Sequence, residues 1–243
     1  MNAYIRPLVV IFFALVWPLC IFSGYFSAGF PYTHDGENHL ARFANYAVAL
    51  KEGQFPPRIA PNLFNGYGYP VFNYNYPLAN ILSLPFSFLK LSYETTFSLL
   101  VFGFSAIGFL GIWQLLEALK KELSFSTTAQ LFTALVYSTT PYILSSILYR
   151  GSIGEIMAYG LFPWILWTIA YASQESSPDV QKNKLFFQNF LPLLIIQTAV
   201  WTAFFLSHNV SVLFGTTLAA TYAFIMLPKT IKAWSYCIAP IIF

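Results

Sequence analysis

Residues 96–117 read TFSLLVFGFSAIGFLGIWQLLE, and this run decides the fold of the chain. No charged side chain occurs in it before Glu117, and a helix needs only roughly 20 apolar residues to cross a bilayer. Hydrophobic residues make up 57% of the whole chain. Because a soluble domain cannot hide so much apolar surface, the sequence predicts an all-α, polytopic bundle of transmembrane helices.

Apolar runs of comparable length recur along the chain. The predicted spans are residues 7–29, 96–117, 127–148, 154–172, 185–206 and 209–227, with a seventh that begins near 233 and stops in mid-span at Phe243. We therefore expect residues 1–243 to be the N-terminal part of a single transmembrane domain in a longer protein.

One further apolar stretch, Pro77–Leu91, is too short to span a bilayer, contains Pro85 and carries Lys90 near its end. This pattern favours a helix that lies in the membrane interface or re-enters it. Residues 30–95 are then one long outer loop.

The basic residues set the orientation of these spans. With a cytoplasmic N-terminus, seven basic residues lie inside, in plain connecting segments: Arg6, Lys120, Lys121, Lys182, Lys184, Lys229 and Lys232. Five lie outside, mostly among acids, glycines and aromatics: Arg42, Lys51, Arg58, Lys90 and Arg150. We therefore predict a multi-pass protein of the plasma membrane with its N-terminus in the cytoplasm. In this topology Glu117 and Lys120 belong to a solvated inner loop.

The outer loop carries the densest polar cluster of the chain, Thr33–Arg42, with two of the three histidines. Apolar residues at helical spacing predict an amphipathic helix from Asp35 to Lys51 that lies on the membrane. Thr33 or Asp35 can cap this helix, and Gly53 ends it.

Beyond Gly53 the loop is rich in glycine, proline, asparagine and tyrosine, as in Asn65-Gly66-Tyr67-Gly68-Tyr69-Pro70. This composition suits a binding interface. It also suits a carbohydrate surface, where aromatic rings stack on sugar faces and amides bond hydroxyl groups.

His34-Asp35-Gly36-Glu37 is the sharpest chemical motif. A carboxylate near the membrane surface can act as a general base, and Asp35 with Glu37 can hold a divalent cation together with water. The structural alternative is that Asp35 only caps the following helix. Both interpretations stay open on the chemistry of the residues alone.

Two later junctions place polar residues at the same face. Arg150 and Glu155 lie between the third and fourth predicted spans, and His208 lies between the fifth and sixth. Arg150 can clamp a phosphate. Alternatively, it reaches the lipid headgroups while Glu155 complements a helix N-terminus, and His208 is an ordinary interfacial residue.

Ionisable groups thus converge on the outer face from three separate segments: His34, Asp35, Glu37, His39, Arg58, Arg150, Glu155 and His208. Such groups are costly beside hydrocarbon, so their convergence at one depth predicts an active or transport site.

Several other classes of site are excluded. The chain has no phosphate-binding glycine loop, no dinucleotide fingerprint, no zinc-ligand spacing and no nucleophile elbow. Its net charge of +3 reflects loop lysines and predicts no nucleic-acid partner. Cys20 and Cys237 both lie in apolar runs and predict neither a disulfide framework nor a metal site.

Taken in order, these motifs resemble those of the GT-C superfamily of membrane glycosyltransferases, which use a polyprenyl-phosphate-linked sugar as donor. The chain is most similar to the bacterial integral membrane family labelled "6-pyruvoyl-tetrahydropterin synthase-related", although nothing in it indicates pterin chemistry. The matching features are His34-Asp35, His39-Leu40, Arg42, Gly53, Pro57-Arg58, Gly66-Tyr67-Gly68-Tyr69-Pro70, the aromatic stretch to Pro77, Arg150-Gly151, Glu155 and His208-Asn209.

The resemblance implies an all-α bundle with juxtamembrane helices. It implies that Asp35 activates the acceptor or holds a cation, with His34 beside it and Glu37 as a second carboxylate. It also implies that Arg58 and Arg150 hold the lipid phosphate. The remaining substrate-binding candidates are Glu155, His208, Tyr67 and Tyr69.

The predicted function is transfer of a sugar from a polyprenyl-phosphate donor in the bilayer to an extracytoplasmic acceptor, such as a cell-envelope glycan or glycoconjugate. One alternative is a transporter or flippase of lipid-linked solutes, which needs ionisable groups at mid-membrane depth and broken helices. Another is a non-catalytic membrane assembly protein whose outer loop binds a partner.

Overall fold

The computed structural model describes residues 5–27, 30–120, 123–175, 186–227 and 234. In these ranges the regular secondary structure is helical. An isolated antiparallel β-bridge joins Ala60 and Tyr69. The helices are α1 (Ile5–Ile21), α2 (Gly24–Ser27), α3 (Gly36–Lys51), η1 (Val71–Asn73), α4 (Leu78–Phe88), α5 (Tyr93–Leu119), α6 (Thr127–Ser138), α7 (Pro141–Ser145), η2 (Ser146–Arg150), α8 (Ile153–Glu175), α9 (Phe186–Phe205) and α10 (Asn209–Met226). The predicted all-α class is confirmed for the described residues.

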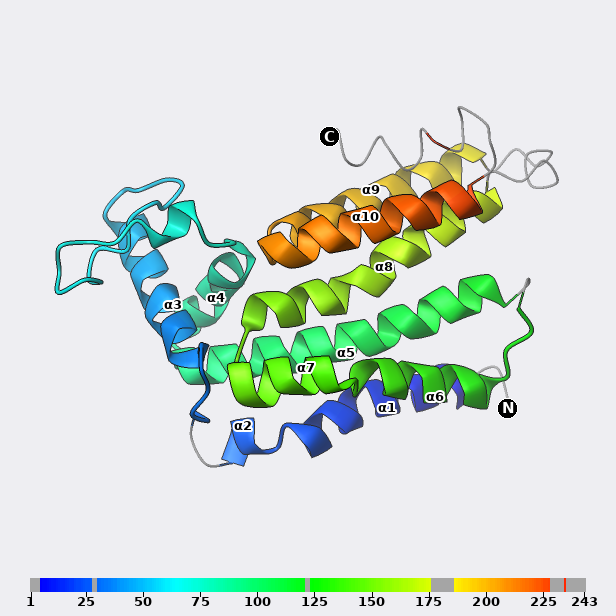
Figure 1. Ribbon diagram of the computed structural model, residues 1–243, viewed down its shortest axis with the longest axis horizontal. Coiled ribbons are helices and arrows are strands. Elements are labelled where there is room, and N and C mark those ends of the chain that lie inside the picture. Colours follow the sequence, from blue (N-terminus) through cyan, green and yellow to red (C-terminus); the bar gives the residue numbers. More distant parts are fainter. Residues whose placement is uncertain (1–4, 28–29, 121–122, 176–185, 228–233, 235–243) are drawn as a thin grey trace.

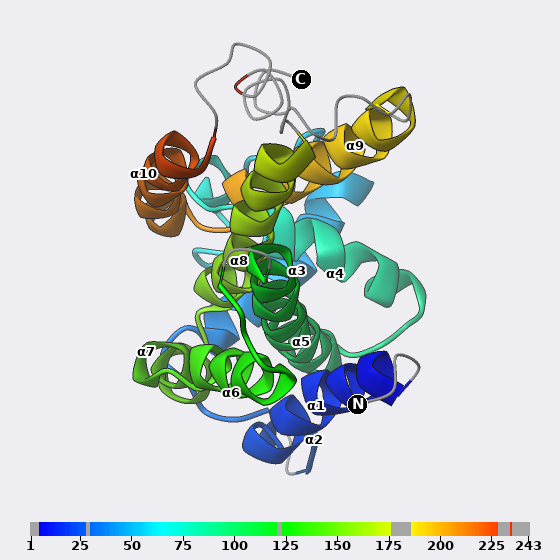
Figure 2. The ribbon, with the colours of Figure 1, turned by 90° about the vertical axis from the view of Figure 1, so that its right-hand side faces the viewer.

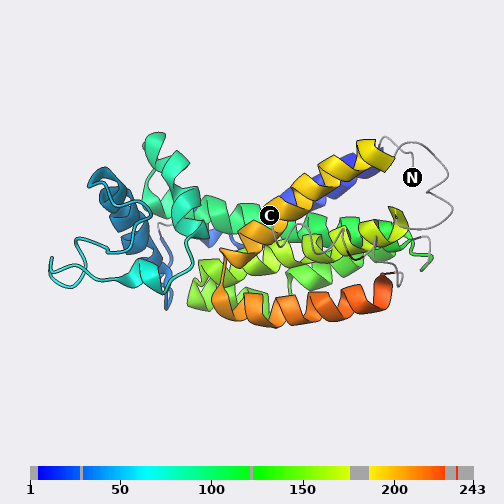
Figure 3. The same cartoon turned by 90° about the horizontal axis from the view of Figure 1, so that it is seen from above.

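The long helices run along the long axis of the molecule, and α3 and α4 lie with their loops at one end of it (Figure 1). Seen along the bundle, α5 and α8 occupy the centre, with the other long helices around them (Figure 2). The view from above shows the loops of α3 and α4 projecting beyond the ends of the bundle helices (Figure 3). We call this end the loop end, and the end that carries Arg6 the N-terminal end.

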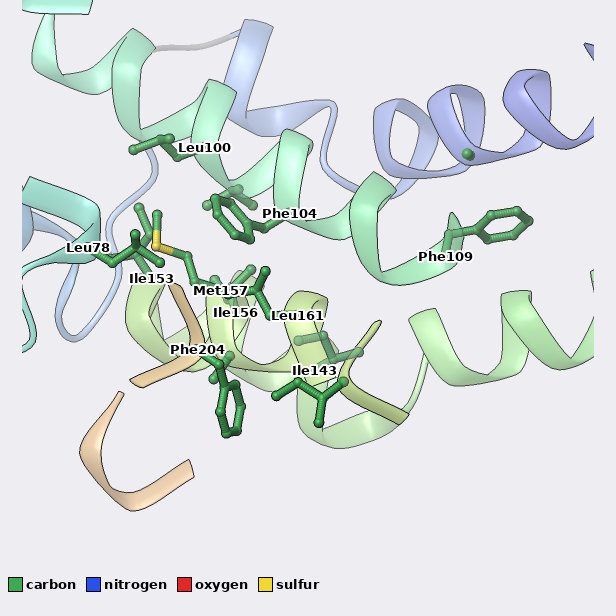
Figure 4. Packing of buried hydrophobic residues seen from close by; sticks show 14 of the residues in the cluster. Leu78, Leu100, Phe104, Phe109, Ile143, Ile153, Ile156, Met157, Leu161 and Phe204 are labelled. Atoms are coloured by element: carbon green, nitrogen blue, oxygen red, sulfur yellow. The ribbon is translucent and has the colours of Figure 1, made fainter. Parts of the chain in front are cut away.

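The centre of the bundle is the contact between α5 and α8. A Cβ atom on Gly160 would lie 2.4 Å from the carbonyl oxygen of Phe104, so only glycine permits the two helices to approach this closely. Gly108 faces Gly160 across the same contact. Small residues at such crossings are typical of helices packed in membranes. Around them, buried apolar side chains such as Met157 fill the core (Figure 4).

Three helices in the described residues are long and apolar enough to cross a membrane, namely α5, α8 and α10. A fourth crossing is counted if α6 and the segment Pro141–Arg150, which are bent by 42° relative to each other, form one span. The chain therefore has the helices of a membrane protein, with fewer full-length spans in the described residues than the sequence predicts.

The differences from the predicted spans have local causes. The predicted span 127–148 is bent because Thr140, which precedes Pro141, takes an extended conformation that ends α6. The predicted span 7–29 contains a break, since α1 ends at Ile21 and α2 is a separate short helix. The predicted seventh span falls, apart from Trp234, outside the described residues.

The two shorter helices predicted in the outer loop are present. Helix α3 covers the stretch expected to be amphipathic, buries Phe43, Tyr46 and Ala49, and is followed by Gly53 at a φ of +86°. Helix α4 occupies the apolar stretch that was too short to span a bilayer.

The N-terminal end holds a polar cluster that the sequence did not predict. Arg6 pairs with Glu117 through both of its terminal nitrogens, and it donates a 2.8 Å hydrogen bond to Gln130. Gln130 is fully buried and donates in turn to Glu117, while the Arg6 guanidinium lies 4.9 Å from the centre of the Trp113 ring. Glu117 is therefore part of the contact between α1, α5 and α6, and its prediction as a solvated loop residue was wrong.

Between the two ends, a cavity of about 10 Å³ lies between α1, α5, α6, α7 and α8. It is lined by Trp17, Ser105 and Ser138, whose buried polar atoms have no hydrogen-bond partner among the described residues. These groups are uncharged, unlike the clusters at either end.

Candidate functional site

A buried carboxylate organises the loop end. Glu155, in the first turn of α8, is 5% exposed. Its Oε2 accepts hydrogen bonds from Tyr142 (2.6 Å), Arg150 (2.7 Å) and Ser146 (3.2 Å). Its Oε1 lies 3.8 Å from Nε2 of His208. The sequence placed Arg150, Glu155 and His208 at one face, and the structure brings these three together.

A change of helix type before α8 creates this arrangement. After α7, residues Ser146–Arg150 form a wider π-helical turn, and Gly151 follows in the left-handed conformation with a φ of +64°. Turns of this kind occur often at functional sites. Glycine tolerates this conformation without strain, so the chain can reverse and start α8 beside the turn it has just left. Arg150 thereby reaches a carboxylate five positions later.

The His34-Asp35 motif is fixed to this turn through the backbone. The N–H of Asp35 donates to the carbonyl oxygen of Arg150 (2.7 Å), and the N–H of His34 donates to that of Tyr149 (3.1 Å). Nδ1 of His34 lies 3.0 Å from a carboxylate oxygen of Asp35. Asp35 thus lies next to Arg150, although the two are far apart in sequence.

Asp35 occupies the N-cap position of α3, but its side chain does not cap the helix. Thr33 Oγ1 accepts the N–H of Gly36, whereas the Asp35 side chain makes no capping bond. The Asp35 carboxylate is 32% exposed and therefore accessible beside the Arg150 turn.

Three aromatic rings connect the outer loop to the Glu155 cluster. The Tyr76 ring centre lies 5.1 Å from that of His208 and 6.3 Å from that of His39. Burial lowers the pKa of His39 to about 3, with Arg42 and His208 adding to the effect. Burial also lowers the pKa of His208, although Glu155 acts in the opposite direction. Both rings are therefore neutral at pH 7.

The hydrogen bonds of His208 define its tautomer. As the cap of α10, its Nδ1 accepts the N–H of Ser211 at 3.3 Å. In a neutral ring the proton then resides on Nε2, which faces Glu155. His208 can therefore donate a hydrogen bond toward the carboxylate.

A groove of about 710 Å³ opens beside this cluster. Its polar end is formed by Tyr142, Arg150, Glu155, His208 and Ser211. Its apolar part follows α8 and α10 and includes Ala158, Phe162, Phe204, Val210, Phe214 and Leu218. Phe214 and Leu218 are both more than half exposed. The groove is thus amphipathic, with an apolar part along α8 and α10 and a polar end at the Glu155 cluster.

Other predicted site residues lie elsewhere. Arg58 lines a separate cavity of about 310 Å³. Tyr67 and Tyr69 are exposed on their loop, at 88% and 46%, and line neither the groove nor that cavity. Glu37 is exposed in the first turn of α3. Arg58, Tyr67 and Tyr69 therefore do not join the Glu155 cluster.

The predicted cation site gains no further ligands. Among the described residues, no three His, Cys, Asp or Glu side chains are grouped so that they could hold a metal ion. Side chains two positions apart at a helix start do not face one another, which makes Asp35 and Glu37 a poor chelating pair.

The structure also adds residues that sequence reasoning missed. Tyr142 and Ser146 bind Glu155, and Tyr76 contacts His208. Only Tyr76 had a signal, since it belongs to the aromatic stretch that precedes Pro77. Tyr142 and Ser146 lie in an apolar segment whose bend, seen only in the structure, directs them to Glu155.

The chain was compared with known proteins by sequence and by structure. No protein-family model, no curated protein and no solved structure matched it. The case for a function therefore rests on the geometry described above.

Proposed function

We propose that the protein is a membrane glycosyltransferase of the GT-C kind. It takes a sugar from a polyprenyl-phosphate donor and transfers it to an acceptor at the extracytoplasmic face of the plasma membrane. One observation carries the proposal: an amphipathic groove ends at a buried ionisable cluster, and the Asp35 backbone is hydrogen-bonded to the same turn.

The groove matches the two parts of such a donor. An isoprenoid chain is apolar and flexible, and it would lie along Phe162, Phe214 and Leu218. The phosphate would meet Arg150, which is 38% exposed and uses one terminal nitrogen to bind Glu155. A guanidinium has five N–H donors, so others remain for a phosphate. Glu155 thus positions Arg150 for the phosphate.

The transfer step assigns a role to each group. The acceptor oxygen forms a bond to the anomeric carbon of the sugar as the bond from that carbon to the phosphate oxygen breaks. Asp35 takes the proton of the acceptor hydroxyl, and His34 orients its carboxylate. The polyprenyl phosphate leaves with the electron pair, and Arg150 stabilises its developing charge.

Turnover of a radiolabelled polyprenyl-phosphate sugar by the full-length protein in proteoliposomes tests this function. We expect Asp35→Asn to abolish transfer while polyprenyl phosphate still binds, and Arg150→Ala to weaken both. Lys90→Ala, which changes an exposed cation away from the groove, is the control and should behave as the wild type. If both Asp35→Asn and Arg150→Ala turn over the donor as fast as the wild type, the proposed function is wrong.

The bend between α6 and the Pro141–Arg150 segment favours a second candidate, a flippase of lipid-linked solutes. Broken helices that line a substrate site are typical of transporters. A fluorescent polyprenyl phosphate in proteoliposomes distinguishes the two. Movement of the probe between leaflets without any acceptor supports the flippase, whereas sugar release that depends on an acceptor supports the transferase.

A further inference from the structure

The cavity that contains Arg58 is a second site, separate from the groove. It has a volume of about 310 Å³, within the range of small-molecule sites in proteins, which starts at about 300 Å³. It lies between α3, the Pro56–Arg58 turn and the start of α4. Its lining includes Tyr46, Arg58, Phe72, Asn73, Asn75 and Asn80.

The walls of this cavity are held in place by hydrogen bonds. Gln54 Oε1 accepts the N–H groups of Arg58 (3.3 Å) and Ile59 (3.1 Å), which fixes the turn that carries Arg58. The Tyr46 and Phe72 rings meet edge to face with centres 5.1 Å apart. A cavity that is preformed in this way orders few groups when a ligand binds, which favours affinity.

The lining defines the chemistry of the ligand. The three asparagine amides both donate and accept hydrogen bonds, as a ring of hydroxyl groups requires. The Tyr46 and Phe72 rings offer apolar faces on which a sugar ring can stack. No carboxylate lines the cavity, and among the described residues Arg58 has no acidic partner within ion-pair distance. Arg58 is therefore an uncompensated cation suited to a carboxylate.

The cavity and the groove are neighbours. Tyr76 packs against His208 of the groove, and the next residue, Pro77, lines the cavity. The N–H of Leu78 donates to the carbonyl oxygen of Leu206 (3.0 Å), which ties this segment to the groove side. Tyr46 and Asp35 belong to the same α3 region, and eleven positions correspond to about 16 Å along a helix. A ligand that reaches from the cavity to Asp35 is therefore longer than one sugar.

We propose that this cavity binds the acidic sugar of an oligosaccharide, with the sugar carboxylate on Arg58 and its hydroxyls on Asn73, Asn75 and Asn80. The role of this oligosaccharide as the acceptor rests on the proposed glycosyl transfer. The binding itself does not.

The test is calorimetric titration of the purified full-length protein in nanodiscs, without any donor lipid. The probes are a trisaccharide that ends in glucuronic acid and the same trisaccharide ending in glucose. We expect the acidic form to bind about tenfold more tightly, and Arg58→Gln to remove that difference. Asn75→Ala should weaken both ligands, and Lys51→Gln, an exposed cation outside the cavity, should change neither.

Equal affinity for the two trisaccharides, or an Arg58→Gln variant that binds like the wild type, overturns the proposal. Binding of inorganic phosphate with no binding of either trisaccharide also overturns it, since the cavity is then a phosphate site. If the acidic trisaccharide binds but no sugar is transferred, the proposed binding at the cavity is supported and the proposed glycosyl transfer fails. If transfer proceeds without any preference for the acidic trisaccharide, the cavity proposal alone fails.

Discussion

Each end of the helix bundle contains an arginine–glutamate pair, and the two pairs face different surroundings. At the N-terminal end, Arg6 is the less exposed partner, and Gln130 and Trp113 close over the pair. At the loop end the order is reversed, because the carboxylate of Glu155 is 6% exposed and the side chain of Arg150 is 38% exposed. The cation of the second pair lies at the wall of a groove.

An arginine–glutamate pair does not by itself identify a functional site. Both pairs have good geometry, and both join several helices. What distinguishes Arg150 is its greater exposure, 38% against 24% for Arg6, and the groove that opens beside it. We therefore expect the Arg6 pair to contribute to stability and the Arg150 pair to contribute to the proposed binding of a ligand.

The largest expected effect comes from breaking the loop-end pair. Arg150→Ala should reduce sugar transfer by at least about 100-fold, as loss of a group that stabilises developing charge typically does. Arg6→Ala should leave the turnover of the folded protein almost unchanged. Initial rates normalised to folded protein in nanodiscs measure both, and similar rate losses in the two variants would erase the distinction between the ends.

Breaking the N-terminal pair should instead lower the stability of the protein. Glu117→Ala leaves Arg6 without its acid and should lower the free energy of unfolding by about 1–3 kcal/mol. The double variant Arg6→Met with Glu117→Leu should recover most of this loss, because no unpaired charge remains. Denaturant unfolding in detergent micelles provides the values. If the double variant is as unstable as the single one, the cost does not arise from an unpaired charge.

Acid should act on the loop end, where all three histidines of the chain lie. The pKa of His39 falls from 6.5 to about 3 on folding, so below pH 6.5 the unfolded chain binds more protons than the folded one. Stability should therefore be complete above pH 6.5. It should fall as the pH decreases toward 3, by up to about 1.4 kcal/mol per pH unit.

Thermal unfolding at pH 7.5 and pH 5.5 measures this loss. His39→Phe should reduce the dependence on pH, whereas His34→Gln, at a side chain that is 76% exposed, should retain it. His208 contributes in the same direction as His39, because its pKa is also lowered. An unchanged slope in His39→Phe would show that another group is responsible.

The smallest effect on stability is expected for a substitution at the small cavity midway along the bundle. Ser138 has a buried hydroxyl without a partner in the described part of the chain, so Ser138→Ala should leave the unfolding free energy unchanged or raise it by at most about 1 kcal/mol. Ser146→Ala is the matched change at the loop end, where the hydroxyl donates to Glu155, and it should be destabilising. A clear loss of stability in Ser138→Ala would mean that its hydroxyl does have a hydrogen-bond partner in the folded protein.

Local sequence signals predicted several helices closely. The apolar runs of α5, α8 and α10 lie within a few residues of their predicted bounds, since hydrophobicity is continuous there and Ser92 caps α5. The bend at Pro141 was missed because the apolar run continues through it. A single proline in such a run does not reveal whether the helix kinks, breaks or stays straight.

The candidate site was predictable only where its parts are marked by charge. Arg150, Glu155 and His208 are polar residues at the ends of apolar runs, and they do meet. Arg58 carries the same signal and lies in another cavity, since the course of a long loop depends on contacts such as that of Gln54 with Arg58. The pair of Arg6 with Glu117 spans 111 positions, and no local pattern reports such a contact.

The two backbone bonds that join His34 and Asp35 to Tyr149 and Arg150 have a consequence for changes in chain length. An extra residue before Thr33 can be absorbed upstream of these bonds. One inserted between Arg150 and Glu155 would rotate the carboxylate by about 100° around α8 while Asp35 stayed with the turn. Natural sequences with this architecture should therefore tolerate changes of length before Thr33, and keep the interval from Ser146 to Glu155 constant.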